Sequence, residues 1–104
     1  MITTYHELSA LLPETPPESI VSRTIYQDER RKVVLFAFAA GQELSEHTAS
    51  RPAILHVLRG EARLTLGDQA IDAADGSWAF MPPHLKHSLK AKTPVQMLLT
   101  LLDG

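Results

Sequence analysis

Beyond Pro17, the sequence pattern changes to that of β-strands, in short segments separated by turn residues: 62–66 alternates between apolar and polar residues, whereas 33–39 is apolar throughout. These segments are 20–26, 33–39, 52–58, 62–66, 70–73, 77–81 and 95–102. Between them stand the turn-forming pairs Gly67-Asp68, Asp75-Gly76 and Pro82-Pro83. About seven to nine short strands, with turns roughly every 8–12 residues, predict an all-β antiparallel sandwich or barrel rather than alternating β/α units.

The segment before the prolines has a helical pattern instead. Its apolar side chains fall at helical spacing: Tyr5, Leu8, Leu11 and Leu12. Thr3 or Thr4 can cap the first turn, and Pro13 ends the segment. We therefore expect a single domain over 1–104, with a helix and a strand in 1–32 and a core of about 33–102.

Composition excludes several classes of function. The chain has 104 residues, of which 44% are hydrophobic and 21% charged, as in ordinary globular domains. Its net charge of −2 provides no basic surplus for binding nucleic acid. No apolar run approaches the ~20 residues of a membrane helix, and the N-terminal residues lack a signal-peptide pattern. We expect no nucleic-acid or membrane partner and a cytoplasmic location.

Histidine is the residue type best suited to unusual chemistry here. The chain contains no cysteine, which excludes disulfides, thiolate metal sites and cysteine nucleophiles. Nucleophile motifs, phosphate-binding loops and dinucleotide-binding glycine patterns do not occur. Five histidines remain, at 6, 47, 56, 84 and 87. Any metal site must therefore use imidazoles and carboxylates.

Two stretches around these histidines resemble the two sequence motifs of the cupin family. The first begins at Gly41, reaches His47 after five residues and ends at Gly60. The second is the stretch from Gly76 to His87, with the motif's proline at position 82. The resemblance covers nearly all of the predicted β core. It implies an all-β, antiparallel double-stranded β-helix (the cupin jelly-roll barrel) with a short N-terminal helix.

At two positions where the family motif carries metal ligands, this chain has alanine. The second histidine of the first motif falls on Ala49, and the glutamate falls on Ala53. The resemblance leaves His47 and His87 as ligands of a divalent ion such as Zn, Ni, Mn or Fe. His56 is the candidate third ligand, although strand parity turns position 56 away from position 53 unless a bulge intervenes.

Several alternatives follow from this degenerate motif. The metal site is expected to consist of His47, His87 and His56, with His84 near its opening and His6 outside it. A metal-free module that binds a small molecule, or an isomerase-like cupin with histidine as general base, is the alternative. Whether the protein is an enzyme stays open. The resemblance also implies a homodimer, and the very apolar segments 33–39 and 95–102 are compatible with burial on both faces.

Overall fold

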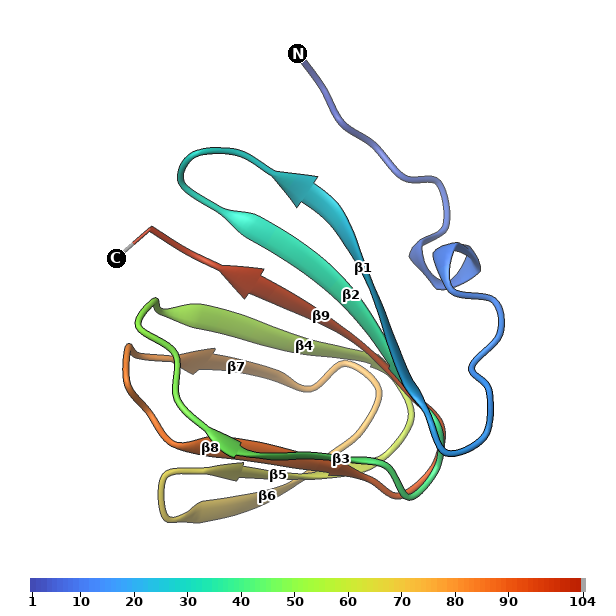
Figure 1. The fold of residues 1–104 in the computed structure, drawn as a ribbon, viewed down its shortest axis with the longest axis vertical. Helices are drawn as coiled ribbons and strands as arrows, with labels where there is room; N and C mark the ends of the chain where they lie inside the picture. Colours follow the sequence, from blue (N-terminus) through green and yellow to red (C-terminus); the bar gives the residue numbers. More distant parts are fainter. Residues whose placement is uncertain (104) are drawn as a thin grey trace.

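The computed structural model describes residues 1–103, which form two antiparallel sheets that face each other (Figure 1). The five-stranded sheet has the order β1-β2-β9-β4-β7, and the four-stranded sheet has the order β3-β8-β5-β6. The strands are β1 (Ile20–Gln27), β2 (Lys32–Phe38), β3 (Glu43–His47), β4 (Ala53–Arg59), β5 (Ala62–Leu66), β6 (Gln69–Ala73), β7 (Trp78–Met81), β8 (His87–Ala91) and β9 (Val95–Leu101). The chain crosses repeatedly from one sheet to the other, as in a jelly roll. The all-β antiparallel fold predicted from the alternation is confirmed.

The hydrophobic core fills the space between the two sheets. In β4, Ala53, Leu55 and Val57 are buried, while the residues between them are only partly covered. The same alternation on the opposing sheet buries Leu64 and Leu89. Among the described residues no polar or charged residue is fully buried, so the core is held by apolar contact alone.

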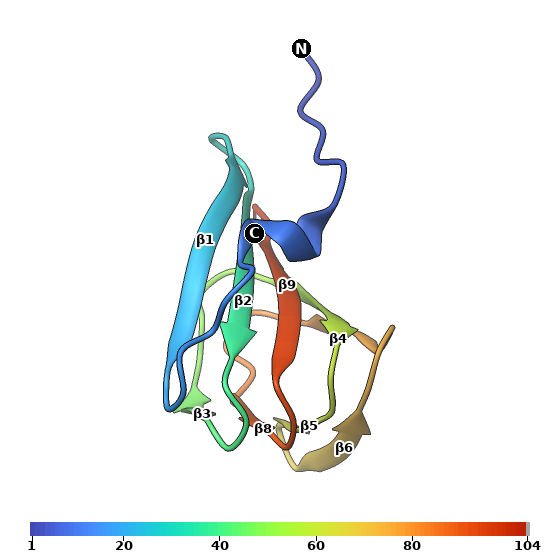
Figure 2. The ribbon, with the colours of Figure 1, turned by 90° about the vertical axis from the view of Figure 1, so that its right-hand side faces the viewer.

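The N-terminal segment crosses the outer face of the five-stranded sheet, over β2 and β9 (Figure 2). It contains one turn of 3-10 helix, η1 (Leu8–Leu11). The side-chain amide of Gln96 in β9 donates hydrogen bonds to the carbonyls of Ser9 and Leu12, at 3.4 and 3.2 Å. Leu35 in β2 faces outward in register with Leu98, yet it is fully buried. The N-terminal segment therefore covers part of the outer face.

The helix is shorter than the sequence predicts. Tyr5 lies outside it and donates a hydrogen bond from its hydroxyl to the carbonyl of Ile25 in β1. Neither threonine caps the turn, because the residue at the N-cap is Glu7 and it makes no capping bond. A four-residue turn that ends just before Pro13 is too short to gain the cooperativity of an α-helix. Residues 1–103 contain no helix with the length and apolar character that crossing a membrane requires.

Two strands of the four-stranded sheet were not expected from the sequence. β3 lies at the sheet edge with four of its five residues exposed, so it shows no apolar alternation. β8 buries only Leu89 and Ala91 and carries polar residues elsewhere. Both strands run through the parts of the two motifs that contain His47 and His87.

Gly60, in the turn between β4 and β5, has no room for a side chain. Its φ is +100°, and its N–H donates a 2.7 Å hydrogen bond to the carboxylate of Asp75. A Cβ added there would overlap the carbonyl oxygen of Pro94 and lie 2.9 Å from Cα of Val95. Gly76 has a similar φ of +86°, but a Cβ there would meet no atom within 4 Å.

This difference provides a matched pair of variants. Gly76→Ala should lower the free energy of unfolding by about 1–2 kcal/mol, the cost of a left-handed backbone for a residue with a Cβ. Gly60→Ala adds the overlap with the backbone that leads into β9 and should cost about 3 kcal/mol or more. Urea denaturation followed by circular dichroism measures both values. Equal losses for the two variants would contradict the assigned contact.

Candidate functional site

A β-bulge in β3 brings His47 opposite His87. In register, Leu44 pairs with Leu89, and His47 pairs with His87. Three residue steps along β3 therefore match two steps along β8, which leaves one extra residue in β3. Without this extra residue Glu46 would oppose His87, and His47 would point away from the space between the sheets.

The two imidazole rings are held in similar ways. Their centroids are 4.0 Å apart and their planes differ by 59°. Nδ1 of His47 lies 2.8 Å from the carbonyl oxygen of Ser45, and Nδ1 of His87 lies 2.9 Å from that of Leu85. Because a carbonyl oxygen can only accept, each Nδ1 carries the proton in these bonds. In the neutral ring, Nε2 then keeps a free lone pair.

Both rings line a small cavity between the two sheets, with a volume of about 50 Å³. Its walls come from the four-stranded sheet, from the five-stranded sheet and from the loops before β4 and β8. The lining residues are His47, Ala49, Arg51, Ala53, Met81, Pro82, Leu85, His87, Leu99 and Leu101. Ala49 and Ala53 leave this cavity without a carboxylate or a third imidazole. Within residues 1–103 no group of three or more metal-binding side chains occurs.

Arg51 is the one lining residue with a permanent charge, and the sequence analysis did not identify it. It lies in the loop between β3 and β4, where its side chain is partly buried. Its Nε donates to the carbonyl of Leu102 and its Nη2 to the carbonyl of Arg30, each at 2.8 Å. The only signal in the sequence was a single basic residue just before an apolar strand.

His56 does not join the other two histidines, which corrects its inclusion in the expected metal site. It pairs with Trp78 of β7 and Leu98 of β9, on the face of β4 opposite to Ala53. The pairing is regular from Ala53 to His56, and the irregularity in β4 comes later, after Val57. The parity rule therefore applies, and the imidazole lies on the outer face of the sheet.

The two remaining histidines lie outside the cavity lining. His84 is exposed and adopts a φ of +67°. Its backbone N–H donates a 2.7 Å hydrogen bond to the carbonyl of Ala49, which ties together the two loops at the cavity. His6 is exposed in the N-terminal segment, as expected.

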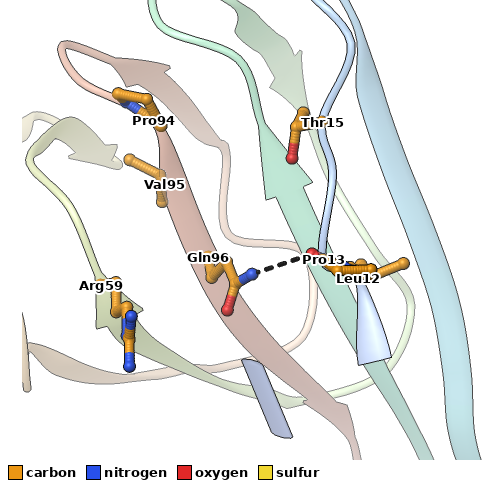
Figure 3. Close-up of a pocket in the computed structure, with 7 residues that line it drawn as sticks. All are labelled: Leu12, Pro13, Thr15, Arg59, Pro94, Val95 and Gln96. Carbon is orange, nitrogen blue, oxygen red and sulfur yellow. Dashed lines mark hydrogen bonds between the residues drawn. The ribbon is translucent and has the colours of Figure 1, made fainter. Parts of the chain in front are cut away.

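A larger hollow of about 300 Å³ lies at the opposite ends of β4 and β9, beneath the N-terminal segment (Figure 3). Its lining includes Arg59, Val95 and Gln96 but no histidine or carboxylate. Figure 3 shows the amide nitrogen of Gln96 turned toward the N-terminal segment, where it is already bonded. We therefore place the candidate site at the smaller cavity, where two imidazoles with free lone pairs converge.

The aspartates with lowered pKa values lie in an exposed turn and an exposed strand, not at this site. Hydrogen bonds from the backbone N–H of Arg30 and the hydroxyl of Tyr26 lower the pKa of Asp28, which organises the turn between β1 and β2. A hydrogen bond from Lys92 and the charge of Arg63 lower the pKa of Asp72 in β6.

Comparison with known proteins establishes the family. The model of the cupin domain family matches residues 34–101, which is more than half of the chain. The chain belongs to the cupin family. The two histidines that line the cavity, His47 and His87, therefore lie in the two cupin motifs, on neighbouring strands of the cupin jelly roll. No curated protein matches the chain.

Several solved structures are similar to this cupin over most of its chain. A cupin superfamily protein from Desulfitobacterium hafniense is 30% identical with a TM-score of 0.85, covering 91% of this chain and 87% of its own. An RmlC-like cupin from Desulfovibrio desulfuricans is 27% identical, with a TM-score of 0.79 and coverages of 98% and 97%. A Streptococcus pyogenes protein of unknown function is 29% identical, with a TM-score of 0.77 and coverages of 84% and 76%.

The carbonyl bonds predict the tautomer of both site histidines. In their neutral form, His47 and His87 should both carry the proton on Nδ1 and leave Nε2 unprotonated. Long-range ¹H–¹⁵N correlation spectra of the imidazoles distinguish the two nitrogens directly. His6 serves as the control, because no hydrogen bond fixes its ring. A proton on Nε2 of either site histidine would contradict the assigned bonds.

Proposed function

We propose that this cupin binds a divalent metal ion through Nε2 of His47 and His87 and presents it to a small molecule. The observation that supports this is the pair of Nδ1–carbonyl bonds. Histidines that bind metals commonly donate their other ring N–H to a carbonyl or carboxylate, which sets both the tautomer and the ring orientation. Here both rings have this arrangement, and their centroids are 4.0 Å apart.

The donor set also indicates which ions fit. Imidazole nitrogen suits Zn, Ni and Fe, whereas Mn prefers oxygen ligands, which the lining side chains do not supply. Two protein ligands leave the other coordination positions to water and to a bound molecule. When bound, such an ion would polarise an oxygen of that molecule. The apolar walls formed by Met81, Leu99 and Leu101 would keep bulk water away from it.

Metal titration tests the proposal. At about pH 7.5, wild-type protein should bind close to one equivalent of Zn²⁺ or Ni²⁺, and His47→Ala and His87→Ala should each weaken binding by about tenfold or more. The affinity should fall in acid, because protonated imidazole cannot ligate. Isothermal titration calorimetry measures both effects, and His6→Ala is the matched control.

The metal titration also decides between the two candidate functions. A wild-type protein that binds less than about a tenth of an equivalent, with no change on His47→Ala, would overturn the metal proposal. The absence of a third ligand would then favour the second candidate, a metal-free cupin that binds a small molecule or acts as an isomerase. In that case Nε2 of His87, which is half-buried at the cavity, is the group placed to accept a proton.

We also propose that the protein forms a homodimer through the outer face of β4 and β7. Trp78 and Phe80 are 61% and 51% exposed although both are large and apolar. Trp78 pairs with His56 and Phe80 with Ile54, so these side chains form one continuous patch over the edge strand β7 and its neighbour β4. A second copy would cover both the aromatic rings and the strand edge. The lack of cysteine fits a cytoplasmic location for this dimer.

Light scattering coupled to size exclusion tests the dimer. At micromolar concentration the wild type should give twice the chain mass of 11.5 kDa. The double variant Trp78→Ser, Phe80→Ser should give the monomer mass, because the patch no longer gains from burial. Ile71→Ser, at a residue 38% exposed on the other sheet, is the control and should stay dimeric. A monomeric wild type would overturn the proposal.

A further inference from the structure

Arg51 is a partly buried cation that forms no ion pair with an acidic side chain within residues 1–103. The ion pairs within residues 1–103 join Asp28 and Asp72 to other basic residues, and none involves Arg51. Its guanidinium instead bonds to two backbone carbonyls, those of Leu102 and Arg30. These bonds neutralise no charge. Arg51, which is one of the residues that line the cavity, therefore keeps its full positive charge.

The two backbone bonds also orient the guanidinium. Arginine has five N–H donors in a planar fork, and the bonds from Nε and Nη2 use two of them. Nη1 and the second hydrogen of Nη2 remain available. A guanidinium held in this way loses little freedom when it binds a planar anion, and a carboxylate matches its geometry.

The rest of the cavity favours an anion as well. Its lining contains no carboxylate, and the two imidazoles are neutral when Nε2 is free. The chain as a whole is acidic, with a net charge of −2, so the positive character is local. The remaining walls are apolar, among them Ala49, Ala53 and Leu99. A charge surrounded by apolar walls is screened less by solvent than one at the surface.

The size of the cavity limits the anion. About 50 Å³ holds a group of only a few heavy atoms. A planar carboxylate on a short hydrocarbon chain fits both this volume and the apolar walls. A phosphate brings more oxygen atoms and more charge, and the walls provide no further donors for them.

We propose that the cavity binds a small carboxylate, with Arg51 holding the carboxylate group beside His47 and His87. The contact with Arg51 stands without a metal. The second contact, between the carboxylate and an ion held by the two imidazoles, rests on the proposed metal function. In that form the carboxylate of the ligand supplies the anionic group that the chain's own side chain lacks at position 53, where the family motif has glutamate.

The first experiment uses only the wild-type protein and two nearly isosteric probes. Acetate and acetamide are titrated separately into metal-free and Zn²⁺-loaded protein, and the NMR signals of the Arg51 side chain and the two imidazoles are followed. Acetate should bind with saturation. Acetamide should bind at least about tenfold more weakly, because it lacks the charge. Equal binding of the two probes, or no saturable acetate binding to either form, would overturn the proposal.

Variants then assign the effect to the guanidinium. Arg51→Gln should weaken acetate binding by about tenfold or more and leave Zn²⁺ affinity within about twofold. Arg51→Lys keeps the charge without the fork and should fall between wild type and Arg51→Gln, which separates charge from a folding defect. Arg23→Gln, at an exposed arginine of β1 on the outer sheet face, is the control and should bind acetate like the wild type.

The outcomes separate this inference from the metal proposal. Acetate binding that depends on Arg51, in a protein that binds no Zn²⁺, would support the inference and overturn the metal function. Zn²⁺ binding that depends on His47 and His87, without any acetate binding, would support the metal function and overturn the inference. Inorganic phosphate that binds more tightly than acetate would overturn the assignment to carboxylates.

Discussion

The extra residue in β3 is the constraint on which the site depends. Strands alternate their side chains strictly, so one inserted residue decides which of two neighbours faces the inside of the molecule. Here it places His47 opposite His87, so that His47 lines the cavity and Glu46 does not, although both residues are exposed. A regular strand would place a carboxylate beside a single imidazole. The bulge therefore places a second imidazole, and not a carboxylate, opposite His87.

The electrostatic character of the cavity follows from what surrounds this pair. Alanines at 49 and 53 remove bulk and negative charge together, and Arg51 adds the one permanent charge. Backbone carbonyls fix all three polar side chains: one orients each imidazole, and two orient the guanidinium. The site thus relies on main-chain acceptors for its geometry, which leaves its side-chain donors and lone pairs for a ligand.

Much of this could be read from the sequence, and the exceptions have physical causes. Apolar alternation predicted most strands, and strand parity correctly argued against placing His56 beside Ala53. β3 was not predicted because an exposed edge strand needs no apolar face. Its bulge was not predicted because it depends on pairing with a strand about 40 residues later along the chain. Arg51 was not identified because its side chain is held by the carbonyls of residues 30 and 102, which come close to it only in the folded chain.

The outer face of the five-stranded sheet explains why whole segments of the sequence are apolar without alternation. Over β2 and β9 the chain's own N-terminal segment covers part of the sheet, and Leu35 on this face is fully buried. Over β4 and β7 nothing in residues 1–103 does so, and Trp78 and Phe80 stay exposed. The apolarity of 33–39 therefore has an intramolecular cause and is weaker support for a dimer than it first seemed in the sequence. The argument for a second copy rests instead on the two aromatic side chains at the edge of the sheet, where covering apolar surface and pairing a free strand edge favour the same partner.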